Sequence, residues 1–102
     1  MATAFLDRVE TAMEPLAPPV NQDFNLLRDG DVGLTIRSGE TMFEIEVAAV
    51  KQQLRFTSPV SGLRVYEWNA RTQRWEDETD SHDIEGLLTR DIMRFCSGIP
   101  LF

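Results

Sequence analysis

Apolar residues recur at helical spacing near the start of the chain. Between Phe5 and Leu16 they return every three or four positions, which places them on one face of a helix. Acidic residues fall on nearly the opposite face. The pattern predicts a helix from about Thr3 to about Glu14, with Thr3 as its cap and Pro18-Pro19 beyond its end.

The middle of the chain alternates apolar and polar residues with the period of two that is typical of strands. In the clearest segment Phe43, Ile45 and Val47 share one side, and Glu44 and Glu46 share the other. Turn-forming residues separate such segments. The predicted strands cover residues 23–27, 32–36, 42–47, 53–58 and 63–68, with a short further strand around Trp75.

A second helical stripe closes the chain. We expect Asp80 or Ser81 to cap this helix and Ser97-Gly98 to end it. The order of elements predicts an α+β fold, a two-layer α/β sandwich with both helices on one face of an antiparallel sheet of five to seven strands. The other face should be open and polar. The apolar stripe of the second helix consists of Ile84, Leu87, Leu88, Ile92 and Phe95.

The 102 residues fit a single domain spanning the whole chain, and 42% of them are hydrophobic, which suffices for one core. No apolar run approaches the roughly 20 residues that span a bilayer. The first residues resemble neither a secretion signal nor an Arg-rich transit peptide. We therefore expect a monomer away from membranes, either cytosolic or the mature part of an imported protein.

Charge is unevenly spread, with a net charge of −7. Residues 1–50 and 76–85 are acidic, whereas residues 51–74 are mostly basic. The overall balance argues against non-specific nucleic-acid binding. The two-sided pattern favours one surface that attracts cations and another that meets an acidic partner.

Cys96 and His82 are the only cysteine and histidine, so carboxylates must supply most ligands of any metal held within one chain. We interpret His82 as a helix-start residue, with weak metal ligation as the alternative. Cys96 is expected to be a small buried hydrophobe. The acid run of Glu76, Asp77 and Glu78, with Asp80, predicts a solvated loop. The alternative is that these acids extend the surface that attracts cations. No self-contained catalytic site is visible.

Residues 54–68, Leu-Arg-Phe-Thr-Ser-Pro-Val-Ser-Gly-Leu-Arg-Val-Tyr-Glu-Trp, resemble the frataxin family. Its members carry a strand ending in Ser-Pro-X-Ser-Gly, followed by a strand ending in Tyr/Phe-Asp-Trp. Val32–Ile36, Trp75 and Ile84–Leu88 are similar to other family segments, so the resemblance extends from Phe5 to Phe95. This block looks more like mitochondrial than bacterial frataxins, which implies a mitochondrial matrix protein whose transit peptide is absent from this chain.

The resemblance implies an accessory protein of iron–sulfur cluster assembly. It would bind the complex of cysteine desulfurase and iron–sulfur scaffold protein and promote sulfur transfer. Two positions depart from the family pattern: Arg55 stands where many members have an exposed Trp, and Glu46 stands where they often have Asn. We expect Trp68 to be mainly a packing residue. The partner-binding residues implied are Glu44, Glu46, Gln53, Arg55, Ser58, Arg64 and Trp68.

The resemblance also implies weak binding of Fe(II) or Fe(III) by carboxylates on the first helix and the following strand and turn. Such a surface is no closed cage, so its affinity should be modest. The alternative function is an iron chaperone or weak ferroxidase that delivers or stores iron through these groups. A solvated helix face is the plainer interpretation. The implied metal residues, which we call the acidic ridge, are Asp7, Glu10, Glu14, Asp23, Asp29 and Asp31.

Overall fold

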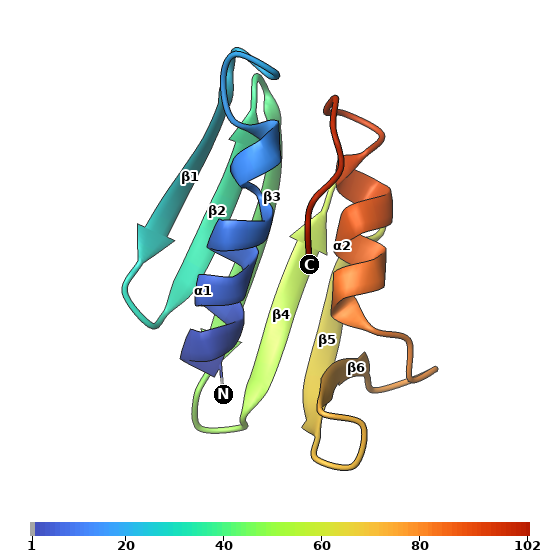
Figure 1. Cartoon of the computed structure of the whole chain (residues 1–102). Coiled ribbons are helices and arrows are strands. Elements are labelled where there is room, and N and C mark those ends of the chain that lie inside the picture. The colour runs from blue at the N-terminus through green and yellow to red at the C-terminus, as the bar shows by residue number, and fades with distance from the viewer. Residues whose placement is uncertain (1) are drawn as a thin grey trace.

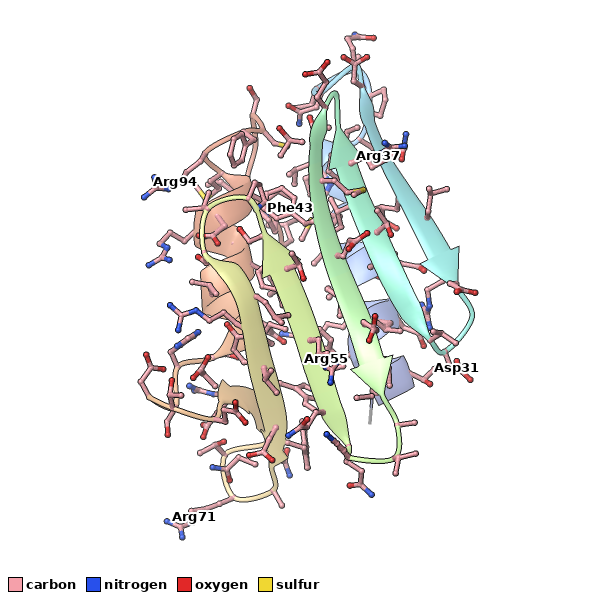
Figure 2. All side chains as sticks on the ribbon, turned by 180° about the vertical axis from the view of Figure 1, so that it is seen from behind. Asp31, Arg37, Phe43, Arg55, Arg71 and Arg94 are labelled. Carbon is pink, nitrogen blue, oxygen red and sulfur yellow. The ribbon has the colours of Figure 1, made fainter. Side chains whose placement is uncertain are left out.

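A computed structural model describes residues 2–102, which form two helices, one short 3-10 helix and six strands (Figure 1). Both helices lie on the same face of the sheet, and the opposite face is open (Figures 1 and 2). The predicted two-layer sandwich is therefore confirmed. The elements are α1 (Ala2–Ala12), η1 (Glu14–Leu16), β1 (Phe24–Asp29), β2 (Gly33–Ser38), β3 (Thr41–Ala48), β4 (Gln53–Ser58), β5 (Gly62–Asn69), β6 (Arg74–Asp77) and α2 (Ile84–Ile92).

The six strands form one antiparallel sheet in the order β1-β2-β3-β4-β5-β6. Short turns connect sequential neighbours, as a meander requires. Residues that face each other across paired strands share a side of the sheet. The register therefore decides which predicted side chains lie against the helices and which lie on the open face.

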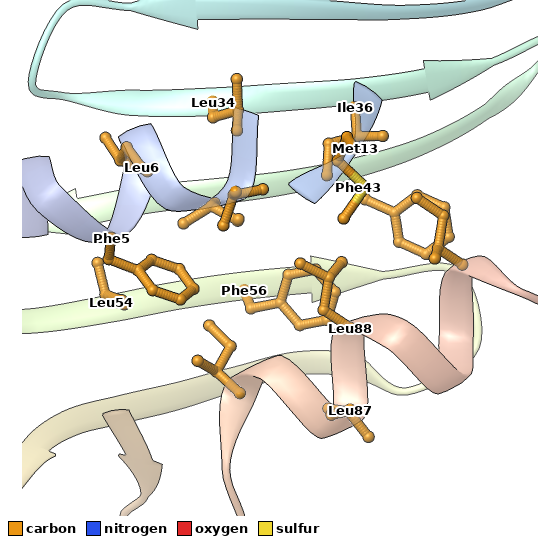
Figure 3. Close-up of a cluster of buried hydrophobic side chains, with 14 of the residues drawn as sticks. Phe5, Leu6, Met13, Leu34, Ile36, Phe43, Leu54, Phe56, Leu87 and Leu88 are labelled. Carbon is orange, nitrogen blue, oxygen red and sulfur yellow. The ribbon is translucent and has the colours of Figure 1, made fainter. Parts of the chain in front are cut away.

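The core lies between the sheet and the two helices. Phe43, Ile45, Leu54 and Phe56 project from β3 and β4 toward the helices, and each is at most 2% exposed. Leu6, Met13 and Leu88 meet them from the helical layer (Figure 3). Alternation along the strands predicted this face correctly, because burial on one side imposes the period of two.

The first helix starts and ends earlier than predicted. Thr3 lies within α1 rather than capping it, and α1 ends at Ala12. Glu14–Leu16 form a separate 3-10 turn in which Pro15 occupies an early position. Proline has no backbone N–H to donate and its ring restricts the preceding turn, so the α-helix cannot continue through it.

The second helix is capped by Asp83, and the prediction of Asp80 or Ser81 was wrong. The Asp83 carboxylate accepts a hydrogen bond from the Glu85 backbone N–H at 3.2 Å. This bond satisfies one of the free N–H groups at the start of the helix. The helix ends at Ile92, so Phe95 lies beyond it and is 44% exposed, although its ring still packs edge-on to Phe43.

The second strand begins one residue later than predicted, at Gly33. Val32 lies in the preceding turn and is exposed, whereas Leu34 and Ile36 are buried as expected. A side chain at position 33 would place its Cβ 2.6 Å from the carbonyl oxygen of Ile45. Glycine therefore permits the close approach of β2 and β3 at this point.

The chain end closes the helical layer. Residues after α2 return between the two helices (Figure 1), where the Leu101 backbone N–H donates to the Ala12 carbonyl at 2.9 Å. Arg8 of α1 and Glu85 of α2 form an ion pair at 2.7 Å. Among residues 2–102, no helix is long and apolar enough to cross a bilayer.

Candidate metal and partner sites

The open face of the sheet carries four of the seven predicted partner residues. Glu44 and Glu46 on β3 and Arg55 on β4 are exposed, and Gln53 is half-buried. Arg55 faces Glu46 across the β3–β4 pair, and their charged groups are 3.8 Å apart. In the view of this face Arg55 lies in the middle of the sheet (Figure 2).

Apolar side chains surround this ion pair. Leu63 is opposite Thr57 and Val65 is opposite Arg55, so both share the open face. Leu27 reaches the same face from β1. Leu27 and Leu63 are 58% and 61% exposed. An open face with charges among exposed apolar groups is a reasonable protein contact surface.

The other three predicted partner residues lie on the helix side of the sheet. Arg64 is paired with the buried Phe56, and Trp68 is paired with the buried Trp75. Ser58 is only 3% exposed. Arg64 and Ser58 were expected to line the open face, and that placement was wrong by one residue of alternation, because a shift of one residue moves a side chain to the other face.

Ser58 holds the loop between β4 and β5 against α2. Its hydroxyl donates to an Asp91 carboxylate oxygen at 2.8 Å, and the Ser61 hydroxyl donates to the same oxygen at 2.6 Å. The Ser58 oxygen also accepts from the Val60 backbone N–H at 3.0 Å. Asp91 is fully buried. The Ser-Pro-X-Ser-Gly segment therefore has a structural role that sequence pattern alone did not reveal.

Trp68 packs against Trp75, as expected. Their rings meet edge to face, with centroids 5.6 Å apart. Trp75 in turn contacts Phe5 of α1, with ring centroids 6.4 Å apart. The pair closes the end of the core where β5 and β6 meet α1. Cys96 is also buried, which confirms its predicted role as a small apolar group.

The acidic ridge contains its own cation. Arg28 of β1 projects toward α1, where one guanidinium nitrogen lies 2.9 Å from Asp7 and 3.0 Å from Glu10. Asp31 is 4.0 Å from the guanidinium. The Gly30 carbonyl accepts from Arg28 Nε and fixes the side chain. Hydrogen bonding to Glu10 raises the pKa of the guanidinium above its ordinary value, against the opposing effect of burial, so Arg28 remains charged.

The remaining ridge residues are spread out. Asp23 precedes β1 and Asp29 ends it. Six residues of extended chain separate them by about 20 Å. Glu14 lies in η1, and both Asp29 and Glu14 are exposed. Of the six ridge residues, only Asp7, Glu10 and Asp31 therefore lie close together, and the Arg28 guanidinium fills the space between their carboxylates.

The acid run between β6 and α2 is not simply a solvated loop. The Asp77 side chain is 3% exposed and lies on the helix side of the sheet, paired with Tyr66. One oxygen, Oδ1, accepts from the Thr79 hydroxyl, the Thr79 backbone N–H and the Asp80 backbone N–H. Burial would raise the Asp77 pKa, but these hydrogen bonds outweigh it and lower the pKa, so Asp77 is a carboxylate.

His82 is held from both sides of its ring. Nδ1 is 2.5 Å from Asp80 Oδ1, and Nε2 is 2.6 Å from the hydroxyl of the buried Tyr66. Nε2 also lies 4.0 Å from Asp77 Oδ2. Hydrogen bonds from the His82 backbone N–H and ring lower the pKa of Asp80. His82 is thus fixed in a loop rather than placed at the first turn of α2.

Asp77, Asp80 and His82 bring one possible ligand atom each to within 4.8 Å of one another. They are the residues of 2–102 that meet this criterion, and the ridge carboxylates do not. The sequence showed the acids and the histidine as neighbours. It did not show that Asp77 turns inward, because that depends on its register with Tyr66.

Comparisons with known proteins agree with this architecture. Residues 1–98 match the model of the frataxin-like domain. A solved frataxin from Psychromonas ingrahamii, studied as a model for stability within the CyaY protein family, superposes with a TM-score of 0.72. It is 16% identical, and the alignment covers 89% of this chain and 80% of that one. The comparison with curated proteins gives no significant match.

The fold is thus that of a two-layer sandwich with an open antiparallel sheet. The chain belongs to the frataxin-like family, because the family match spans nearly its whole length. Membership supports a role in iron–sulfur assembly or iron handling.

Proposed function

We propose that this protein binds the complex of cysteine desulfurase and iron–sulfur scaffold protein and promotes sulfur transfer to the scaffold. The observation that supports this most is the open face of β3, β4 and β5. There the Glu46–Arg55 pair lies beside Leu63 and Val65, and neither helix formed by residues 2–102 covers it (Figure 2).

The chemistry of this face suits a protein partner. Exposed apolar side chains supply area that association removes from water. Arg55 and Glu46 pair only loosely with each other, since 3.8 Å is too long for a hydrogen bond. Each can therefore reorient toward an opposite charge on the partner, which would set the register of binding and increase its rate.

The test is a binding titration with the desulfurase–scaffold complex at near-physiological salt. We expect Arg55→Ala to weaken binding roughly tenfold, which corresponds to about 1.4 kcal/mol. Arg71→Ala is the matched control, because Arg71 is an exposed arginine at the end of the molecule, in the turn between β5 and β6 (Figure 2). Absence of binding by the wild type, or equal loss in both variants, would overturn the proposal.

Iron is proposed as a weakly held cargo of the acidic ridge. Asp7 and Asp31 are exposed and Glu10 is partly so, yet all three share Arg28 as a counterion. An incoming ion must compete with that guanidinium, which favours modest affinity. This arrangement supports partner binding over iron delivery as the main role.

The iron-chaperone or ferroxidase alternative makes a separate prediction. Replacing Asp7, Glu10, Glu14 and Asp23 by Asn or Gln should abolish iron binding in that case, while Arg55→Ala leaves it intact. Anaerobic Fe(II) titration followed by amide NMR distinguishes the two. Unchanged iron binding in the fourfold variant would remove the ridge from either function.

The mitochondrial matrix is the proposed location, supported by the likeness of residues 54–68 to mitochondrial frataxins. Cell fractionation with an antibody against the protein tests it. Recovery in the cytosol alone would contradict the proposal.

A further inference from the structure

An open groove lies in the uncovered face of the sheet, and we call it the sheet groove. It extends from Leu27 on β1 to Leu63 on β5, and strands β1 to β5 all contribute to its lining. Its volume is about 370 Å³, at the small end of the range of roughly 300–1,000 Å³ for ligand pockets. Both helices lie on the other side of the sheet (Figures 1 and 2).

The register of the strands explains the shape of the groove. One row of opposed residues crosses the face from Leu27 through Thr35, Glu44 and Thr57 to Leu63. The two leucines, 58% and 61% exposed, form apolar walls on either side of the short threonines. Four interstrand spacings separate these walls by about 19 Å. This width admits a single helix, which is about 10–12 Å across, or one extended segment.

Gly33 keeps the base of the groove hollow. It lies in the neighbouring row, opposite Glu46, and contributes to the lining. A Cβ at this position would lie 2.6 Å from the Ile45 carbonyl oxygen, so the packing of β2 against β3 excludes a side chain here. The hollow is therefore formed before any ligand binds, which lowers the cost of binding.

The charge of the sheet groove is negative. Of the residues within 2–102 that line it, three are acids, Asp29, Glu44 and Glu46, and one, Arg55, is a base. Asp29 and Glu44 are exposed, and within the same part of the chain neither takes part in an ion pair. A groove with excess carboxylates attracts a positively charged group.

These features together select one kind of occupant. Exposed leucines favour an apolar side chain, because association removes both surfaces from water. A carboxylate that a partner covers is costly without a counterion, so an apolar side chain alone does not suffice. Another copy of this chain would bring a net charge of −7 to an acidic groove, which disfavours self-association here.

We propose that the sheet groove binds a segment of a protein partner in which apolar side chains lie next to a lysine or arginine. The apolar side chains would lie between Leu27 and Leu63, and the base would pair with Glu44. This inference rests on the proposed function, because it describes the part of the desulfurase–scaffold complex that meets this face. Arg55 then contacts a separate acidic group of the same partner.

The first test is an amide NMR titration with two blocked tetrapeptides, Lys-Leu-Leu-Lys and Glu-Leu-Leu-Glu, at near-physiological salt. We expect saturable shifts at Thr35, Glu44 and Leu63 with the basic peptide only. Glu44→Lys should weaken its binding at least tenfold. Glu40→Lys is the matched control, because Glu40 is exposed in the turn between β2 and β3 and does not line the groove.

The apolar wall is tested in the same way. Leu63→Ser should weaken binding of the basic peptide several-fold. Leu101→Ser should leave it unchanged, because Leu101 is equally exposed but lies on the helical side of the sheet. The substituted side chains are exposed, so these variants should remain folded. Binding of neither peptide, equal binding of both, or equal effects of Glu44→Lys and Glu40→Lys would overturn the inference.

The same variants, titrated with the desulfurase–scaffold complex, separate this inference from the proposed function. Glu44→Lys and Leu63→Ser should each weaken binding of the complex about tenfold, and the two controls should not. If the wild type binds the complex and these variants bind it equally well, the inference fails while the proposed function stands. If the wild type binds the basic peptide at the groove but not the complex, the proposed function fails and the groove's preference for a basic, apolar segment stands.

Discussion

Acidic residues on the α1 side and the α2 side of the molecule serve different purposes. Beside α1, Asp7 and Asp31 are exposed and share a single arginine. Beside α2, Asp91 and Asp77 are buried. Asp91 accepts hydrogen bonds from two serine hydroxyls. Asp77 accepts hydrogen bonds from one threonine hydroxyl and two backbone N–H groups. In sequence these residues look alike, but only the second pair is part of the fold's interior.

The difference has an energetic consequence. An exposed ion pair contributes little, because water and salt screen it and two long side chains must be ordered. A buried carboxylate has already lost its hydration, so the groups that donate to it depend on it. Substitutions should therefore act mainly on stability beside α2 and mainly on cation attraction beside α1.

Asp91→Ala should have the largest effect. It leaves the hydroxyls of Ser58 and Ser61 without their acceptor and loosens the β4–β5 loop from α2. We expect a loss of about 3 kcal/mol in the free energy of unfolding, measured by urea denaturation. A loss below about 1 kcal/mol would show that the buried carboxylates beside α2 contribute no more to the free energy of unfolding than the exposed ones of the ridge.

Ser58→Ala and Ser61→Ala test the cause of that effect. Each alone should cost about 1 kcal/mol, because one donor to Asp91 remains. In the Asp91→Ala background each serine substitution should cost much less, as a double-mutant cycle reveals for groups in contact. If the losses in the free energy of unfolding simply add, the two serines do not stabilise the protein through Asp91.

Asp77→Ala should come next, with a loss of about 2 kcal/mol in metal-free buffer. Its three donors belong to Thr79 and Asp80, which are exposed, so water can replace part of what is lost. Glu78→Ala beside it changes the same charge on an exposed side chain and should stay within about 0.5 kcal/mol. Equal losses in the two variants would show that charge rather than burial matters.

The fold was largely predictable, for a physical reason. Residues such as Phe43, Ile45, Leu54 and Phe56 alternate with polar ones because one face of the sheet is buried. That pattern is local, so a single sequence contains it. Helix ends were less predictable, since Asp80, Ser81 and Asp83 are all good caps and only the course of the loop selects Asp83.

The sites were less predictable because they depend on register and on contacts distant in sequence. Arg64 was expected on the open face, but its pairing with the buried Phe56 places it on the helix side. In the sequence Arg28 is only one base among many acids. Its position between Asp7 and Glu10 requires β1 to lie beside α1, which sequence spacing does not state.

Arg28→Gln should have a small effect on stability and a clearer one on cations. Removing the guanidinium leaves Asp7, Glu10 and Asp31 to repel one another, which should cost about 1 kcal/mol at low salt and less at 1 M salt. Divalent-ion binding at the ridge should become several-fold tighter in amide NMR titrations. Arg37→Gln removes the same charge from β2 and is the control; equal tightening there would mean that only net charge matters.

Glu14→Gln should have the smallest effect of all. Glu14 is exposed, and among residues 2–102 it takes no part in an ion pair, so the free energy of unfolding should change by less than about 0.5 kcal/mol. It lies apart from Arg28, so ridge cation binding should also change less than in Arg28→Gln. Chemical denaturation and the same ion titration measure both. A loss above about 1 kcal/mol would mean that the exposed side contributes to the fold after all, and the contrast between the two sides would then fail.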